Sequence, residues 1–259
     1  MILSHPTPFR LQQAGFTLVE MAIVMLIVAL LLGGLAPTLS SQMDQKNLNE
    51  TRKQLDEIQQ ALVGYAVVNG RLPCPATLIS KGAESFASGG TPPHSANDGV
   101  CSNFYAGFVP AATLGLQGAN DSGLIVDAWG NPIRYAVTLW NYTFTKSDGM
   151  RTTGLANISP ASFSFLLVCA SATGITTSPP SCGTGGTSLT STPGVPAIVF
   201  STGKNGGQAG GTNVDELANI AGTRVFISHG FIQDGFDDLV AWVSPNILLN
   251  RMVMAGKLP

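Results

Sequence analysis

The chain has 259 residues, and only 11% of them are Asp, Glu, Lys or Arg, against about 25% in an ordinary soluble domain. With 13 basic and 15 acidic side chains it has no positive excess, which excludes a nucleic-acid binder. Its hydrophobic content of 44% excludes disorder driven by charge.

Apolar residues are concentrated near the N-terminus. Residues 21–43 contain no charged side chain, and residues 16–36 are apolar apart from Thr17 and Glu20. A helix needs about 20 apolar residues to cross the hydrocarbon core of a bilayer, so the segment predicts one membrane span over 16–36. A secretory signal cleaved near Ala36 is the alternative.

A short polar leader, residues 1–15, precedes this span. Arg10 is its one firm positive charge. The positive-inside rule therefore predicts a cytoplasmic N-terminus, with the rest of the chain on the other side of the membrane. The four cysteines agree with this orientation, because they would lie on the oxidising side.

Glu20 is a carboxylate within an apolar segment, where a charge is costly to insert and is usually functional. One interpretation is that it reaches back to the lipid head groups from the first turn of the helix. The other is that a cation on a neighbouring chain pairs with it, since a buried carboxylate is tolerated when a cation meets it.

The string AGFTLVE at residues 14–20, followed by an apolar run, resembles the class III signal of type IV pilins and type II secretion pseudopilins. The resemblance implies that a prepilin peptidase cuts between Gly15 and Phe16 and methylates the new amine on Phe16. It also implies that Glu20 pairs with that amine on a neighbouring subunit. Gly15 offers no side chain that would obstruct the cleaved bond.

A polar but periodic stretch follows Pro37, and it predicts an amphipathic helix over 37–68. Six side chains form a seam at a and d spacing: Leu48, Thr51, Leu55, Ile58, Leu62 and Tyr65. The seam is too short for a free coiled coil, so we expect it to cover the core of its own domain. The whole helix would run from 16 to 68, loosened at Pro37 and ended by Asn69-Gly70.

Residues 69–259 predict a loop-rich periplasmic sheet domain. Five short β-type runs lie between turn residues, at 133–140, 163–170, 196–201, 224–228 and 239–243. No helical crossover of 10–15 residues separates them, so an antiparallel sheet is expected. Ser244-Pro245 then predicts the start of a short final helix. The expected fold class is α+β, and the resemblance implies a pilin-like arrangement of a long N-terminal helix packed on an antiparallel sheet.

The segment DAWGNP at residues 127–132 extends the resemblance. It is similar to the D-P-W-G-N-P-Y segment of major pseudopilins, with Ala128 where that family often has Pro. We expect a structural role, in which Trp129 packs under the loop, Gly130 permits a tight turn and Pro132 opens a strand. Insertions near 76–100 and 171–195 make the chain longer than typical major subunits, which indicates a minor pilin or pseudopilin.

Cys74, Cys101, Cys169 and Cys182 lack C-x-x-C spacing, which argues against zinc and thioredoxin-type chemistry. Three pairings are open. The pairs Cys74–Cys101 and Cys169–Cys182 are favoured because each closes a loop-rich segment, contributing about 3 kcal/mol by chain entropy. Reduced, buried cysteines are the alternative.

The resemblance also implies a cofactor, because major pseudopilins have a calcium-stabilised loop near their C-terminal strands. Candidate oxygen ligands form two groups here: Asn205, Asn213, Asp215 and Glu216, and then Asp234, Asp237 and Asp238. The preferred ligands are Asn205, Asp215, Asp234 and Asp237. No D-x-D-x-D-G loop is present, so a hairpin loop with solvated acids is the alternative.

No catalytic motif such as G-x-S-x-G or H-E-x-x-H accompanies these features. We therefore expect a minor subunit of a type IV pilus or type II secretion pseudopilus, and not an enzyme. Its expected partners are other pilin or pseudopilin subunits, the prepilin peptidase and the bacterial inner membrane, with no nucleic acid. The competing hypothesis is a membrane-anchored or secreted periplasmic binding module or enzyme whose N-terminus is only a signal-anchor.

Overall fold

The computed structural model describes residues 15–154, 157–158, 165–190, 194–206, 213–232 and 235–258, without the side chains of residues 32–41. The chain divides into two compact units, Met1–Lys46 and Asn47–Pro259. Residues 1–14 of the expected leader lie outside the described residues.

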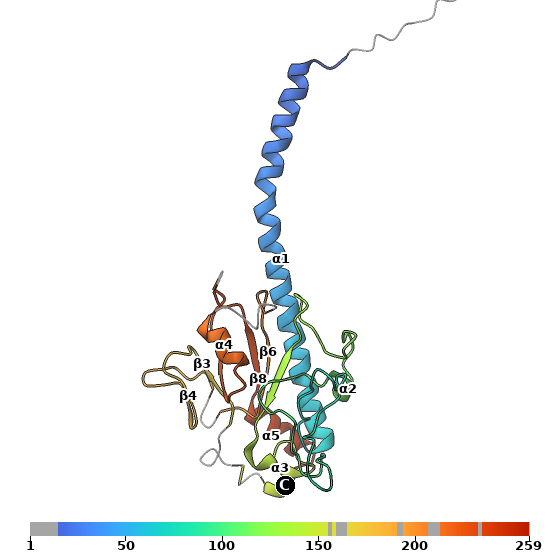
Figure 1. Cartoon of the computed structure of the whole chain (residues 1–259), viewed down its shortest axis with the longest axis vertical. Coiled ribbons are helices and arrows are strands. Elements are labelled where there is room, and N and C mark those ends of the chain that lie inside the picture. Colours follow the sequence, from blue (N-terminus) through green and yellow to red (C-terminus); the bar gives the residue numbers. More distant parts are fainter. Residues whose placement is uncertain are drawn as a thin grey trace, which may run out of the picture. The chain divides into compact units, whose positions relative to one another are not determined.

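Helix α1 runs from Leu18 to Asn69 (Figure 1), close to the predicted 16–68. Its backbone stays helical through Pro37, where a loosening was expected. Gly70 ends the helix in the left-handed conformation at φ +69°, and its N–H donates to the carbonyl of Ala66 at 2.8 Å. This is the C-terminal cap that the Asn-Gly pair predicted.

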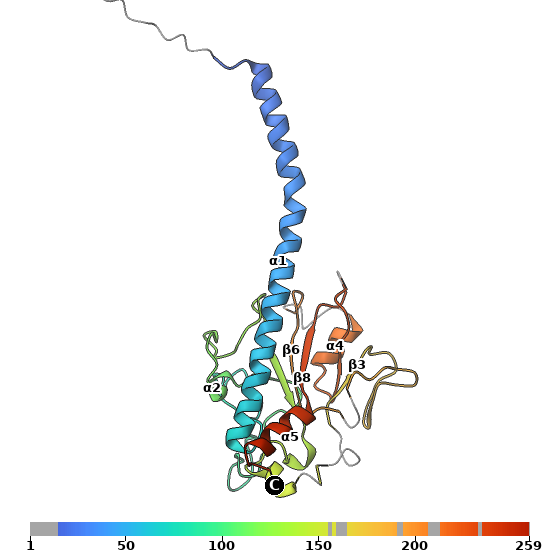
Figure 2. The same ribbon diagram turned by 180° about the vertical axis from the view of Figure 1, so that it is seen from behind.

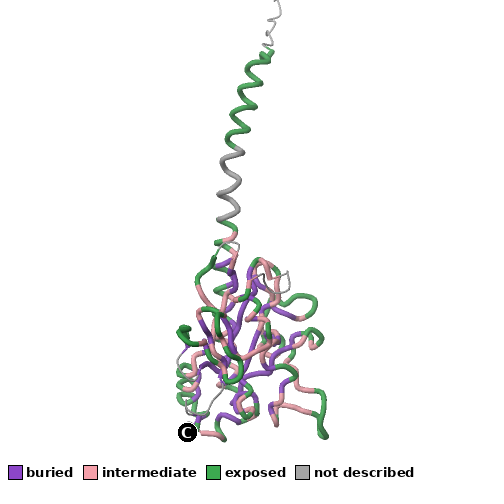
Figure 3. Tube along the Cα trace, turned by 60° about the vertical axis from the view of Figure 1, so that its left-hand side comes forward, coloured by how far each residue is buried: buried purple, intermediate pink, exposed green. Residues whose placement is uncertain are grey.

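All described side chains from Gly15 to Leu31 are exposed (Figure 3). Among the described residues, no helix combines the length and the apolar character that a membrane crossing requires. The last five residues of the predicted span, 32–36, belong to the segment whose side chains are not described.

The C-terminal part of α1, which carries the seam, covers the core of its own domain, as the seam predicted. Five of the six seam side chains are buried: Leu48, Thr51, Leu55, Ile58 and Leu62. The sixth, Tyr65, is half-buried. Three of them, Leu55, Ile58 and Leu62, join one hydrophobic cluster with residues of the sheet and of the last helix. The polar side chains between them form the solvated face.

The central sheet has four antiparallel strands in the order β1-β2-β6-β8. They are β1 (Gly107–Phe108), β2 (Arg134–Val137), β6 (Ala197–Ser201) and β8 (Leu239–Val243). Three of these strands lie inside predicted β-type runs. Strand β1 lies outside the five predicted runs.

Both faces of this sheet are buried. Tyr135 and Val199 point toward the cluster that holds α1 residues, whereas Ala136, Ile198 and Phe200 join a second cluster on the other face. Burial on both faces explains why β6 reads as an unbroken apolar run, with no polar residue before Ser201.

Strands β3 (Leu167–Cys169) and β7 (Val225–Ile227) correct the expectation of a purely antiparallel sheet, because they pair in parallel. The chain between them passes through the hairpin of β4 (Thr176–Thr177) and β5 (Pro180–Ser181), then β6 and helix α4 (Val214–Ile220). A parallel pair needs a long connection, and this one runs through other elements. The absence of a helical crossover between neighbouring predicted strands therefore did not exclude a parallel pair.

The described residues include four further helical segments: α2 (Ala111–Leu114), η1 (Trp140–Tyr142), α3 (Gly149–Thr153) and α5 (Pro245–Met254). Figure 2 shows α2 and α5. Only α5 was predicted. Pro245 occupies its first turn as expected, but the side chain of Ser244 makes no capping hydrogen bond.

The DAWGNP segment forms a tight turn around a buried carboxylate. Asp127 Oδ1 accepts hydrogen bonds from the N–H groups of Trp129 (2.9 Å) and Asn131 (2.8 Å), and the Ser201 hydroxyl donates to Asp127 Oδ2. Gly130 has a φ of +89°, the left-handed conformation expected from the turn. Burial raises the pKa of Asp127, while these hydrogen bonds lower it. The tight turn predicted at Gly130 is thus confirmed. Pro132 forms an isolated bridge with Val126 two residues before β2 begins, so it does not itself open the strand, and the packing of Trp129 stays a prediction.

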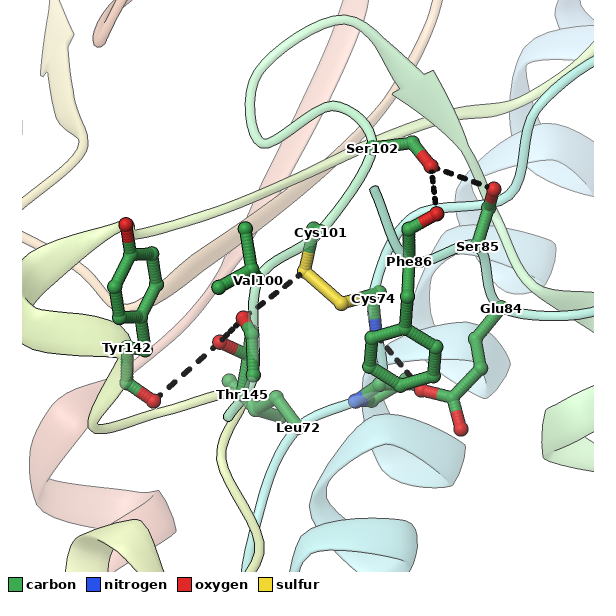
Figure 4. The surroundings of a disulfide bond; sticks show 12 residues. Leu72, Cys74, Glu84, Ser85, Phe86, Val100, Cys101, Ser102, Tyr142 and Thr145 are labelled. Carbon is green, nitrogen blue, oxygen red and sulfur yellow. Dashed lines mark hydrogen bonds between the residues drawn. A yellow bond between two sulfur atoms is a disulfide. The ribbon is translucent and has the colours of Figure 1, made fainter. Parts of the chain in front are cut away.

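Both favoured disulfides, Cys74–Cys101 and Cys169–Cys182, are present. Figure 4 shows the first of them beside Glu84, whose carboxylate accepts the Cys74 N–H at 3.1 Å. The same carboxylate pairs with the Arg71 guanidinium at 2.6 Å, and both side chains are largely buried. The disulfide and the ion pair together fasten the loop after α1 to the domain.

Replacing Cys74 and Cys101 by alanine should lower the stability by about 3.5 kcal/mol, because the bond closes a separation of 27 residues. For a domain of this size the melting temperature should fall by about 7–14 °C. The Cys169–Cys182 pair closes only 13 residues, so its removal should cost about 0.7 kcal/mol less. Thermal unfolding followed by circular dichroism measures both, and a larger loss for Cys169–Cys182 would contradict the chain-entropy account.

Candidate functional site

The junction between Gly15 and Phe16 lies outside any helix or strand, just before α1. Phe16 is exposed, and a Cβ placed on Gly15 would meet no atom within 4 Å. A peptidase needs an irregular, unobstructed peptide bond, and this one meets both requirements.

Glu20 forms a capping box with Thr17 at the start of α1. The Glu20 carboxylate accepts hydrogen bonds from the Thr17 N–H (2.9 Å) and hydroxyl (3.0 Å), and the Thr17 hydroxyl accepts the Glu20 N–H at 3.2 Å. Two N–H groups that the first turn would leave without partners are thereby satisfied. This role of Thr17 was not predicted, although the T-x-x-E spacing is the ordinary sequence signal of a capping box.

The Glu20 carboxylate is fully exposed and has local hydrogen-bond donors but no partner cation among the described residues. It is therefore open to a cation from another molecule. Glu20 is also the only charged side chain between residues 16 and 43.

A second candidate site lies where α4 meets the start of β8. Glu216, Asp237 and Asp238 are buried there, and one carboxylate oxygen from each lies within 4.8 Å of the others. Glu216 is placed by a capping box with Asn213 at the start of α4. The Asp237 N–H donates to Glu216 Oε1 at 3.0 Å, which joins the two elements.

Three buried oxygen atoms at this site accept no hydrogen bond from the described residues: Asn205 Oδ1, Asp237 Oδ1 and Asp238 Oδ1. The neighbouring oxygens are satisfied, since Asp237 Oδ2 accepts the Lys204 N–H (2.9 Å) and Asp238 Oδ2 accepts the Asn219 amide (2.7 Å). Buried acceptors without a donor are costly, and a bound cation would remove that cost.

Burial raises the pKa of both aspartates, to about 6 for Asp237 and about 8 for Asp238. Backbone hydrogen bonds oppose the shift at Asp237, and the Asn219 amide opposes it at Asp238. The negative charge of Glu216 raises both values further. Acids at such a site hold protons when no metal neutralises them.

The donor set fits a hard divalent cation. Three carboxylates are ligands that Ca²⁺ prefers, and backbone carbonyls or water would complete its six to eight oxygens. The Asn205 amide presents its nitrogen to the cluster, because Nδ2 donates to the two carboxylate oxygens of Glu216 at 3.1 and 3.2 Å. Thiolate and imidazole donors, which favour zinc, are not part of the cluster.

Two of the preferred calcium ligands, Asn205 and Asp237, lie next to each other. The backbone N–H of Asn205 donates a hydrogen bond to Asp237 Oδ2 at 3.1 Å. Asp234 lies outside the described residues. Asp215 has other partners, since it accepts the Ala172 N–H (2.6 Å) and contacts His229 Nε2 (3.2 Å). Glu216 and Asp238 take part instead, although the preferred set left them out.

Residues 10–36 match the family model of the prokaryotic N-terminal methylation motif. The match includes the Gly15–Phe16 junction, Thr17, Glu20 and the first part of α1. No curated protein and no solved structure matches this chain significantly.

Proposed function

Since the chain carries the prepilin-type methylation motif of type IV pilins and pseudopilins, we propose that it is a structural filament subunit of this kind rather than an enzyme. The observation that carries the proposal is the coincidence of the motif with an accessible Gly15–Phe16 junction and with Glu20 as the one charge of an apolar segment.

The chemistry of assembly follows from those residues. Cleavage after Gly15 creates a positively charged amine on Phe16, and methylation leaves that amine able to carry its charge. When apolar helices pack together and exclude water, this amine on one subunit would pair with the Glu20 carboxylate of its neighbour. The pair contributes register as well as attraction, because an unpaired Glu20 would be costly in that environment.

Before assembly the chain would wait in the inner membrane, with residues 16–36 as anchor, the N-terminus in the cytoplasm and the sheet domain in the periplasm. The prepilin peptidase and other pilin or pseudopilin subunits are its proposed partners. The insertions near 76–100 and 171–195 support a minor subunit.

We also propose that Glu216, Asp237 and Asp238 hold a calcium ion. Its positive charge would neutralise the buried carboxylates and supply a partner for Asp237 Oδ1 and Asp238 Oδ1, which lack one among the described residues. The ion would then fix the start of β8 to α4 and to the loop after β6, so its role would be structural.

Mass spectrometry on protein purified from its native host tests the subunit proposal. We expect a mature chain that begins at N-methylated Phe16. Gly15→Val should leave the precursor uncut, because a branched side chain would obstruct the bond, whereas Ala14→Ser next to it should be processed.

Two outcomes would contradict the proposal. A wild-type chain that still begins at Met1 would show that the motif is not processed. A chain cut near Ala36 would show a secretory signal instead, and the sheet domain would then be a secreted module.

A further inference from the structure

A small hydrophobic cluster, separate from the main core, surrounds the second disulfide. Its buried members are Cys169, Cys182, Val225, Ile227 and Phe236. The Cys74–Cys101 disulfide belongs instead to the large cluster that includes α1 residues. A region with few buried apolar contacts has low local stability, so the part of the chain around the second disulfide depends more on its other interactions.

The second disulfide closes residues 169–182, which we call the disulfide-closed segment. It contains the β4–β5 hairpin, in which Thr176 and Thr177 are exposed. The segment has no charged side chain, so no ion pair fastens it to the domain. Figures 1 and 2 both show the hairpin projecting from the sheet domain beside β3.

A first connection joins this segment to the carboxylate cluster through α4. Asp215 Oδ1 accepts the N–H of Ala172, which lies in the segment, at 2.6 Å. The next residue of α4 is Glu216, which belongs to the cluster. The first turn of α4 therefore holds the segment through one acid and contributes the neighbouring acid to the cluster.

A second connection runs through Asn219 of α4. Its Nδ2 donates to Asp238 Oδ2 (2.7 Å) and to the Ile227 carbonyl (3.0 Å), and its Oδ1 accepts the Ile227 N–H at 2.6 Å. Ile227 faces Cys169 in the parallel β3–β7 pair, and the Ser228 N–H donates to the Cys169 carbonyl at 2.9 Å. Asp238 is thereby connected to the first cysteine of the segment.

A third connection starts at the remaining acid of the cluster, Asp237. The residue before it, Phe236, packs its ring against the ring of His229, with the centroids 3.8 Å apart. His229 Nε2 contacts Asp215 Oδ2 at 3.2 Å. Each of the three acids is therefore connected to the disulfide-closed segment by a short series of contacts.

We propose that calcium at the carboxylate cluster holds the disulfide-closed segment in place, with Asp215 and Asn219 as the positioning residues that transmit its effect. This inference rests on the proposed calcium site. Without the ion, the cluster lacks the cation that would hold α4 and the start of β8 together, and the contacts of Asp215 and Asn219 loosen with them. With the ion bound, opening of the segment must first release calcium.

The rate at which each disulfide is reduced tests the proposal, with the Cys74–Cys101 bond as the internal control. All four cysteines are buried, so a reductant reaches a bond only when the chain around it opens. In metal-free full-length protein in detergent at pH 8, dithiothreitol should reduce Cys169–Cys182 about tenfold faster or more than Cys74–Cys101. Calcium at 100 times its dissociation constant should slow the reduction of Cys169–Cys182 by up to about a hundredfold. Alkylation of the freed thiols and mass spectrometry measure both rates.

The outcomes separate this inference from the proposed calcium site. Equal reduction rates of the two bonds in metal-free protein would contradict the inference, because the segment would then open only together with the main core. If calcium raises the melting temperature but leaves the reduction of Cys169–Cys182 unchanged, the site stands and the inference is wrong. If calcium does not raise the melting temperature, the proposed site and the inference are both wrong.

Variants of Asp215 test its positioning role. Asp215→Ala removes the acceptor of the Ala172 N–H but keeps the three acids of the cluster. Its melting temperature should still rise with calcium, whereas calcium should slow the reduction of Cys169–Cys182 only about threefold or less. Asp215→Asn keeps an oxygen for that N–H and should restore most of the protection. Asp121→Ala, which removes an exposed acid elsewhere, should behave as the wild type. Full protection by calcium in Asp215→Ala would exclude Asp215 as a positioning residue.

Discussion

A full-length chain with Glu20→Ala should be processed at the Gly15–Phe16 junction and then be absent from filaments. The reason is that the new amine on Phe16 of the neighbouring subunit would have no carboxylate partner once water is excluded around the packed helices. Immunoblotting of sheared filaments against the membrane fraction measures incorporation. We expect at least a tenfold loss from filaments, with the protein retained in the membrane.

Three further variants test whether the charge of Glu20 is the reason for the expected loss from filaments. Glu20→Gln keeps the shape but removes the charge, so it should be lost to the same extent. Glu50→Ala removes another exposed acid of α1 and should assemble normally. Thr17→Val keeps the Glu20 carboxylate but removes its hydroxyl partner, so it should assemble with reduced efficiency. Normal incorporation of Glu20→Ala would overturn the pairing.

Calcium should raise the melting temperature of the metal-free protein much more at pH 8 than at pH 5. The pKa values of Asp237 and Asp238 are raised from 3.8 to about 6 and about 8. The folded domain therefore binds protons that the unfolded chain releases, and the metal-free domain loses stability as the pH rises from about 4 to about 8. A cation reverses this loss, but at pH 5 protons compete with it for the carboxylates.

The size of the calcium effect can be bounded. At 100 times its dissociation constant, calcium would stabilise the domain by about 2.7 kcal/mol, which corresponds to about 5–11 °C at pH 8. Scanning calorimetry with and without a chelator measures this difference.

Variants of neighbouring aspartates identify the ligands. Asp238→Asn should raise the melting temperature of the metal-free protein at pH 8, because it removes a buried charge, and should abolish the response to calcium. Asp215→Asn is the control and should keep that response, since Asp215 contacts Ala172 and His229 instead. An equal calcium response in the Asp238→Asn variant would exclude the cluster as the metal site.

Much of the α+β organisation could be predicted because its signals are local. The seam from Leu48 to Leu62 follows helical periodicity, and each residue turns the chain by a fixed angle, so spacing alone specified the buried face. The unbroken apolar run at β6 likewise predicted a strand, and the Ser-Pro pair before α5 predicted the start of a helix. The disulfide pairs followed from the short loops that they close.

The parallel pairing of β3 with β7 could not be predicted in this way. Leu167 and Val225 are far apart in the sequence, and no local pattern encodes which strands become neighbours. Their pairing depends on packing against the second face of the central sheet, where Val168 and Phe226 meet Phe200. That packing is decided by the whole domain.

The sequence by itself was enough to predict the methylation motif around Gly15 and Phe16, the charge at Glu20 and the two favoured disulfide pairs, because each depends on residues at short spacing. Only the tertiary structure decided between Asp215 and Glu216 as members of the carboxylate cluster. Neighbouring residues of a helix point about 100° apart, so one faces the buried cluster while the other faces His229. Burial of the cluster likewise arises where distant segments meet, which no single stretch of sequence specifies.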